Sequence, residues 1–166
     1  MPVEIERKFL VSGEGWRKGG AGERYCQGYI VSGNVTVRVR RAGATAMLTI
    51  KGRPRGIVRP EFEYPIPVDD AEELLESMCR KPLVEKLRYE VPHAGHIWHV
   101  DEFGGKNAGL VLAEIELARD DEAFARPDWI GREVTHEKKY RNSSLGTDWS
   151  VPPSDSVPQS AMATAP

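Results

Sequence analysis

The sequence predicts an antiparallel α+β protein in which eight β-strands close into a barrel forming a charged tunnel, with a few peripheral helices. Eight stretches alternate polar and apolar residues with period two, which is typical of strands. Short glycine-containing segments separate several of these stretches, and one segment shows a clear helical period. Many strands with few helices favour a closed antiparallel sheet.

The strands are predicted from this alternation, in chain order. A glycine-rich loop over 13–22 follows the first of them and includes one short helical turn at Trp16. The eight strands are expected over 3–11, 24–32, 35–42, 45–52, 57–66, 84–91, 96–102 and 109–118.

The clearest helix is predicted over 69–80. Asp69 and Asp70 favour its N-terminus, and apolar residues recur along one side of it. That apolar stripe consists of Leu74, Leu75 and Met78. Shorter helical stretches are expected over 120–125 and 136–145.

The length of 166 residues fits one domain, which we place at 2–148. Residues 149–166 are rich in Pro, Ser and Ala and offer little apolar surface to bury, so we expect a disordered tail there. No apolar run approaches the roughly 20 residues that a membrane-spanning helix needs. The N-terminus lacks the pattern of a secretory signal, and we expect a protein that does not bind membranes.

The charge balance and the cysteines exclude several classes of partner. The 23 basic and 25 acidic residues give a net charge of −2, without the basic excess typical of nucleic-acid binding. Cys26 and Cys79 are far apart, and neither has a Cys or His at metal-binding spacing. A disulfide scaffold or a structural zinc site is therefore not expected, and a cytoplasmic location is favoured.

Charged residues recur at positions i and i+2, and therefore on one face of each strand. Like charges about 7 Å apart repel, so their repetition does not stabilise a sheet. A solvated face is the ordinary interpretation of alternation, but it rarely repeats like-charged pairs. If these faces point inward, they line a tunnel suited to a highly charged ligand. The acidic members are Glu4, Glu6, Glu61, Glu63, Asp101, Glu114 and Glu116, and the basic members are Lys8, Arg38, Arg40, Lys51, Lys86 and Arg88.

The two sets match complementary parts of one ligand. Paired carboxylates suit hard divalent cations such as Mg²⁺ or Mn²⁺. Arginine and lysine clusters donate hydrogen bonds to phosphate oxygens. The pattern therefore indicates a ligand with several phosphates together with a divalent cation, whereas zinc hydrolysis is disfavoured because histidine and thiolate ligands are not offered.

An ordered series of motifs covers about 2–146. The first motif, close to the N-terminus, is Glu4-Ile5-Glu6-Arg7-Lys8. With it the chain resembles the CYTH family, also called triphosphate tunnel metalloenzymes, whose N-terminal signature is Glu-x-Glu-x-Lys. The later matches are Gln-Gly-Tyr at 27–29, Arg-x-Arg at 38–40, Thr-Ile-Lys at 49–51, Glu-Phe-Glu at 61–63, Glu-Lys-Leu-Arg-Tyr at 85–89, Asp101, Glu-Ile-Glu at 114–116 and Val-Thr-His-Glu-Lys-Lys-Tyr at 134–140.

The resemblance implies an eight-stranded tunnel that binds triphosphate and Mg²⁺ or Mn²⁺. Its metal-side carboxylates would be Glu4, Glu6, Glu114 and Glu116, helped by Glu61, Glu63 and Asp101. Its phosphate-binding residues would be Lys8, Arg38, Arg40, Lys51, Lys86 and Arg88, with Lys138 closing one tunnel end. In the small bacterial branch a Lys–Tyr pair activates the attacking water, which here implies Lys8 and Tyr29. Neighbouring cations would stabilise the phenolate of that tyrosine.

Each of these roles has a structural alternative. Tyr29 is equally consistent with a core tyrosine, Asp101 with a turn cap, and Lys138 with a solvated helix residue. His93, His96 and His99 are interpreted as structural or surface residues.

The function expected from the resemblance is metal-dependent hydrolysis of inorganic triphosphate to pyrophosphate and phosphate. The partner is then a small triphosphate, and the protein a monomer or homodimer. The alternatives are a class IV adenylate cyclase, a thiamine triphosphatase, and a non-catalytic module that binds polyphosphate or nucleotides.

Overall fold

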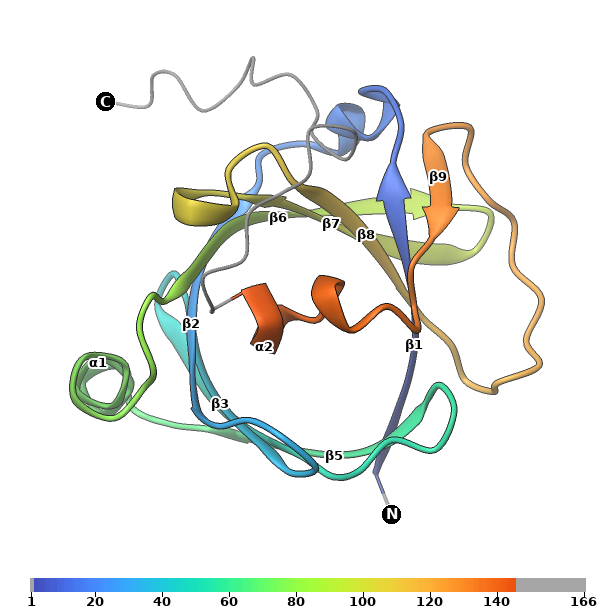
Figure 1. Ribbon diagram of the computed structural model, residues 1–166. Coiled ribbons are helices and arrows are strands. Elements are labelled where there is room, and N and C mark those ends of the chain that lie inside the picture. Colours follow the sequence, from blue (N-terminus) through green and yellow to red (C-terminus); the bar gives the residue numbers. More distant parts are fainter. Residues whose placement is uncertain (1, 146–166) are drawn as a thin grey trace.

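The computed structural model describes residues 2–145 and shows a closed antiparallel barrel, viewed along its axis in Figure 1. The strands follow the order β5-β4-β3-β2-β6-β7-β8-β1, and pairing of β5 with β1 closes the barrel. All eight predicted strands are present, with ends within two residues of those predicted. They are β1 Val3–Val11, β2 Glu23–Val31, β3 Thr36–Ala42, β4 Thr45–Lys51, β5 Val58–Pro65, β6 Val84–His93, β7 His96–Phe103 and β8 Val111–Glu116.

Strand β1 pairs with three other strands and takes part in closing the barrel. Its first residues pair with β5, and residues 6–10 pair with β8. Its last residues also pair with a short ninth strand, β9 (Ile130–Glu133), which the alternation did not reveal. The N-terminal motif is therefore fixed on both sides, with alternate side chains directed into the barrel.

The apolar side chains of the strands pack mainly outside the barrel. Helix α1 (Val68–Ser77) covers β3 and β4, where its Ala71 and Leu75 pack against Val39 and Ala46. Elsewhere the covering comes from η1 (Gly15–Gly19), which contains Trp16, and from the segment between β8 and β9, which contains Phe124 and Trp129. Because the core lies outside the strands, the interior is left to polar groups.

A C-terminal segment enters the barrel and closes one end of it. This segment, residues 138–145, contains η3 (Lys138–Tyr140) and α2 (Asn142–Leu145), and we call it the plug; Figure 1 shows it at the centre of the barrel. Tyr140 and Leu145 are fully buried in a cluster that includes Phe103 and Leu112. The side-chain amide of Asn107, at the end of η2 (Gly105–Asn107), donates a hydrogen bond of 3.0 Å to the carbonyl of Leu145.

The prediction of a helix over 120–125 is wrong, whereas the helical segments at Trp16, 69–80 and 136–145 are confirmed in shortened form. Glu122 pairs with His96 and accepts a hydrogen bond from the backbone of Ala118, and the ring of Phe124 lies 5.7 Å from that of Trp98. These contacts favour an irregular segment over a helix. The expected tail at 149–166 lies outside the described residues. No helix in the described part is long and apolar enough to cross a membrane.

We predict that the outer core dominates stability. Ile115 in β8 is fully buried and faces Trp98 across the strand pair, so Ile115→Ala should lower the free energy of unfolding by about 2–5 kcal/mol. Ile97 in β7 is 51% exposed, and Ile97→Ala should change it by less than about 0.5 kcal/mol. Urea unfolding followed by circular dichroism measures both, and equal effects would contradict this description of the core.

Candidate active site

The inward side chains of the strands line a cavity of about 350 Å³, within the size range of small-molecule sites. The predicted site residues that line it are Glu4, Glu6, Lys8, Tyr29, Arg38, Arg40, Lys51, Glu61, Glu63, Arg88, Glu114 and Glu116. Lys86, Asp101 and Lys138 do not line it. The inward orientation inferred from the paired charges is therefore present in the fold.

Acids and bases are concentrated on different parts of the barrel wall. The neighbouring strands β5, β1 and β8 carry the glutamates, which form an acidic wall made of Glu4, Glu6, Glu61, Glu63, Glu114 and Glu116. Strands β3 and β6 carry Arg38, Arg40 and Arg88. A ligand that fills the tunnel therefore meets carboxylates on one side and guanidinium groups on another.

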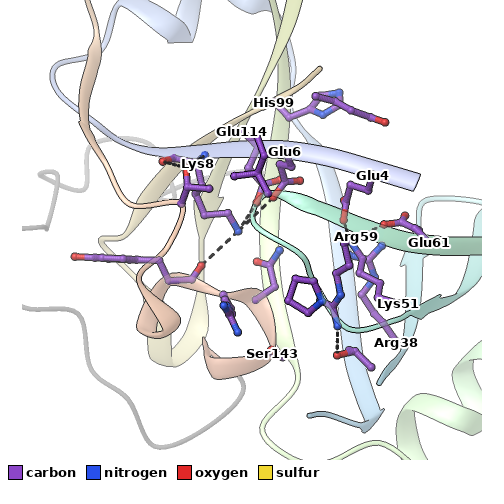
Figure 2. A pocket seen from close by; sticks show the side chains of 18 of the residues that line it. Glu4, Glu6, Lys8, Arg38, Lys51, Arg59, Glu61, His99, Glu114 and Ser143 are labelled. Atoms are coloured by element: carbon purple, nitrogen blue, oxygen red, sulfur yellow. Dashed lines mark hydrogen bonds and ion pairs between the residues drawn. The ribbon is translucent and has the colours of Figure 1, made fainter. Parts of the chain in front are cut away.

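Lys8 links the acidic wall to the plug. Its Nζ lies 2.8 Å from Glu114 and 3.7 Å from Glu6, and it donates a hydrogen bond of 3.4 Å to the carbonyl of Tyr140, as Figure 2 shows. Burial opposes the charge of Lys8, but the carboxylates of Glu114 and Glu6 outweigh it and raise its pKa above the ordinary range. Lys8 is therefore a fixed positive charge at the closed end of the tunnel.

The glutamates of the acidic wall are crowded. Burial, followed by repulsion from Glu114, raises the pKa of Glu6 to about 7, although Lys8 opposes the shift. Burial is also the main cause that raises the pKa of Glu4. A positive ion placed among these carboxylates would relieve their repulsion.

Three further cations that line the tunnel, Arg38, Arg40 and Lys51, are held by ion pairs. Lys51 lies 2.5 Å from Glu4 and 2.7 Å from Glu61. Arg38 and Arg40 approach the same oxygen of Glu63, at 3.3 and 3.4 Å. Thus carboxylates orient each of these three side chains before any ligand binds.

Lys86 and Asp101 lie on the same inward face as Arg88, but they are buried and do not line the cavity. The Nζ of Lys86 is 2.5 Å from Asp101, which also accepts two hydrogen bonds of 2.7 Å from Arg88. Burial, with repulsion from Arg88, lowers the pKa of Lys86 to about 8. The structure thus brings this pair together as a support that orients Arg88, which also bonds Glu114 at 2.7 Å.

Tyr29 lines the tunnel and is only 7% exposed. Its hydroxyl accepts a hydrogen bond of 3.0 Å from the amide of Gln27. Burial raises the pKa of Tyr29, and the opposing charges of Arg38, Lys51 and Lys8 do not reverse the shift. The expectation that the cations lower this pKa does not hold here, because burial of the phenol outweighs their charges.

Several residues that line the cavity were missed by the motif analysis. Arg59 lies two residues before Glu61 on the same face of β5, so the alternation itself contained this signal. His99 also lines the cavity, two residues before Asp101. In the late motif Lys138 lies outside the lining, whereas Tyr140 and residues 141–143 face the cavity.

Comparisons with known proteins agree with this geometry. The CYTH domain family matches residues 2–147. The inorganic triphosphatase of Acetivibrio thermocellus is 51% identical over 146 residues, covering 87% of this chain and 94% of that protein. The inorganic triphosphatase of Nitrosomonas europaea is 35% identical over 153 residues, covering 86% of this chain and 96% of that protein.

The solved structures support the same assignment. The crystal structure of an inorganic triphosphatase aligns with a TM-score of 0.63 at 33% identity, covering 88% of this chain and 95% of that one. The match to the family over nearly the whole described chain, together with the charged tunnel, shows that this protein belongs to the CYTH domain family.

Proposed function

We propose that this protein is a metal-dependent hydrolase that cleaves inorganic triphosphate to pyrophosphate and phosphate. The observation that carries the proposal is the tunnel itself, in which an acidic wall and a set of arginines enclose one small cavity. Two relatives of high coverage, 51% and 35% identical, are named inorganic triphosphatases, which supports the same substrate.

The phosphate oxygens would be bound by Arg38, Arg40, Arg88 and Lys51. These side chains line the cavity and are oriented by carboxylates, so little conformational entropy is lost when an anion replaces those partners. Arginine donates several hydrogen bonds in a planar arrangement that matches phosphate oxygens. Holding the chain of phosphates in one position is the main requirement of phosphoryl transfer.

The acidic wall fits a divalent cation, and we propose Mg²⁺ or Mn²⁺. Its donors are hard carboxylate oxygens, and the raised pKa of Glu6 reflects a local excess of negative charge. Within residues 2–145 no three acidic, histidine or thiol side chains converge closely enough to hold an ion by themselves. Glu6, Glu114, Glu116 and Glu4 would hold the cation, with phosphate oxygens completing its ligands. The ion neutralises charge that develops on the phosphates.

Lys8 and Tyr29 are the pair that we propose to position and activate the attacking water. Lys8 stays charged because Glu114 and Glu6 raise its pKa, and Tyr29 presents a hydroxyl to the cavity. Since burial raises the pKa of Tyr29, its phenol is protonated at neutral pH. Its action as a base therefore increases with rising pH.

The proposal includes a cytoplasmic location and a protein that is a monomer or homodimer and binds a small-molecule triphosphate. The two free thiols, Cys26 and Cys79, fit a reducing compartment. The near balance of charges in the whole chain does not favour a nucleic-acid partner.

The substrate proposal is tested by phosphate release and product analysis with inorganic triphosphate, ATP and thiamine triphosphate, each with Mg²⁺ or Mn²⁺. We expect the highest kcat/KM with inorganic triphosphate, because the lining of the cavity is dominated by charged groups. Faster conversion of ATP to cyclic AMP and pyrophosphate would replace this function with a cyclase.

Metal dependence is tested with a chelator and with variants of the acidic wall. Activity should disappear in excess chelator, and Glu4→Ala, Glu6→Ala and Glu116→Ala should each lose most of it. Glu73→Ala, on the exposed side of α1, should leave it unchanged. Ca²⁺ should bind but support little turnover, since its coordination is longer and looser. Full activity without divalent ions would rule out this role for the wall.

The role of Tyr29 is tested by Tyr29→Phe, which removes only the hydroxyl. We expect kcat to fall by roughly 10²–10⁴, the usual contribution of a positioned base, while triphosphate affinity stays near wild type. The rise of activity at alkaline pH should also disappear. Tyr64→Phe, at an exposed site on β5, is the matched control. If Tyr29→Phe keeps wild-type turnover, Tyr29 is a packing residue.

A further inference from the structure

Two of the cations that line the tunnel stand apart from the ion-pair network. Five of them, Lys8, Arg38, Arg40, Lys51 and Arg88, lie within 4 Å of a carboxylate. Arg59 and Arg141 also line the cavity, but neither makes an ion pair within residues 2–145. Their positive charge is therefore available to an anion without the loss of an existing ion pair.

Arg59 is held in place by neutral groups. Its Nε donates a hydrogen bond of 2.6 Å to the carbonyl of Gly52, and its Nη2 donates one of 2.9 Å to the hydroxyl of Thr36. These acceptors fix the direction of the guanidinium without an ion pair, and Glu4 and Glu61 act on its charge only from beyond ion-pair distance. Figure 2 shows Arg59 beside Arg38 and Lys51, on the side of the cavity away from Glu6 and Glu114.

Arg141 approaches the same region from the plug. Its backbone N–H donates to the carbonyl of Lys138, which sets its place between η3 and α2. Burial is the main cause that lowers the pKa of Arg59; Glu4 opposes the shift, and the charge of Arg141 adds to it. The two guanidinium groups thus repel one another, and a bound anion between them would remove that cost.

A buried donor nearby also lacks a partner. Arg38 lies two residues from Thr36 on the inward face of β3, and its Nε is buried without a hydrogen-bond partner. Arg38 is only 7% exposed, and a buried unpaired donor is costly unless a ligand occupies it. The plugged end of the tunnel therefore offers three guanidinium groups with unused donor capacity.

We propose that Arg59 and Arg141 form a subsite for a terminal phosphate of the substrate at the plugged end of the tunnel. The inference rests on the proposed function. Inorganic triphosphate has a free phosphate at each end, with a charge of up to about −2 on each. In ATP only the γ-phosphate is a free end, and because the plug fills the closed end of the barrel, the nucleoside would have to point away from the plug (Figure 1).

The test measures dissociation constants for inorganic triphosphate and ATP by calorimetry in Ca²⁺, where little turnover is expected. Arg59→Gln and Arg141→Gln should each weaken triphosphate binding about tenfold or more, the usual effect of losing a charged hydrogen bond. Binding of ATP, which carries a free γ-phosphate, should weaken by a similar factor. Arg55→Gln is the matched control, since Arg55 is exposed beside the same end and does not line the cavity.

Unchanged affinity for triphosphate in both variants would overturn the subsite. Melting temperatures show whether Arg59→Gln still folds, and Arg59→Lys, which retains the charge, should keep most of the affinity. The exposed side chain of Arg141 makes Arg141→Gln an independent test that does not disturb packing. A wild-type protein that binds triphosphate but hydrolyses none would contradict the proposed function and leave the subsite intact.

Discussion

The structure depends on opposite charges that are buried together inside a closed barrel. Removing ions from water is costly, and a buried pair offsets that cost only when its geometry and hydrogen bonds are favourable. The group formed by Lys86, Arg88 and Asp101 meets this condition, with contacts of 2.5 and 2.7 Å and no exposure of the aspartate. Lys8 and Glu114 form a second buried ion pair that also meets this condition, and Glu114 pairs with Arg88 as well. A polyanion with a metal ion can replace such pairs because it supplies both signs of charge.

The charged interior in turn explains why the apolar core lies outside the strands. Helix α1, η1 and the segment between β8 and β9 cover the outer faces, so hydrophobic burial is achieved without filling the tunnel. At the plugged end inward positions become apolar, as at Leu112, two residues before Glu114. The same strand therefore lines the cavity and seals it.

Strand positions and inward residues were predictable from the sequence, because both follow from alternation with period two. Exposure to the cavity was not predictable: Lys86 and Asp101 alternate like their neighbours, but both are buried and do not line the cavity. The pKa of Tyr29 was also not predictable, because it depends on how deeply the fold buries the phenol beside the cations. The irregular course of 120–125 arises from tertiary contacts of Phe124, and β9 is too short to give a pattern.

The central claim is that the acidic wall and the arginines bind triphosphate and a divalent cation as one unit. Calorimetric affinity for triphosphate, measured in Ca²⁺ and again in excess chelator, tests this claim most directly. Without the cation, the phosphates face the uncompensated glutamates of the wall, so we predict binding at least about tenfold weaker in chelator. Equal or tighter binding in chelator would contradict the account.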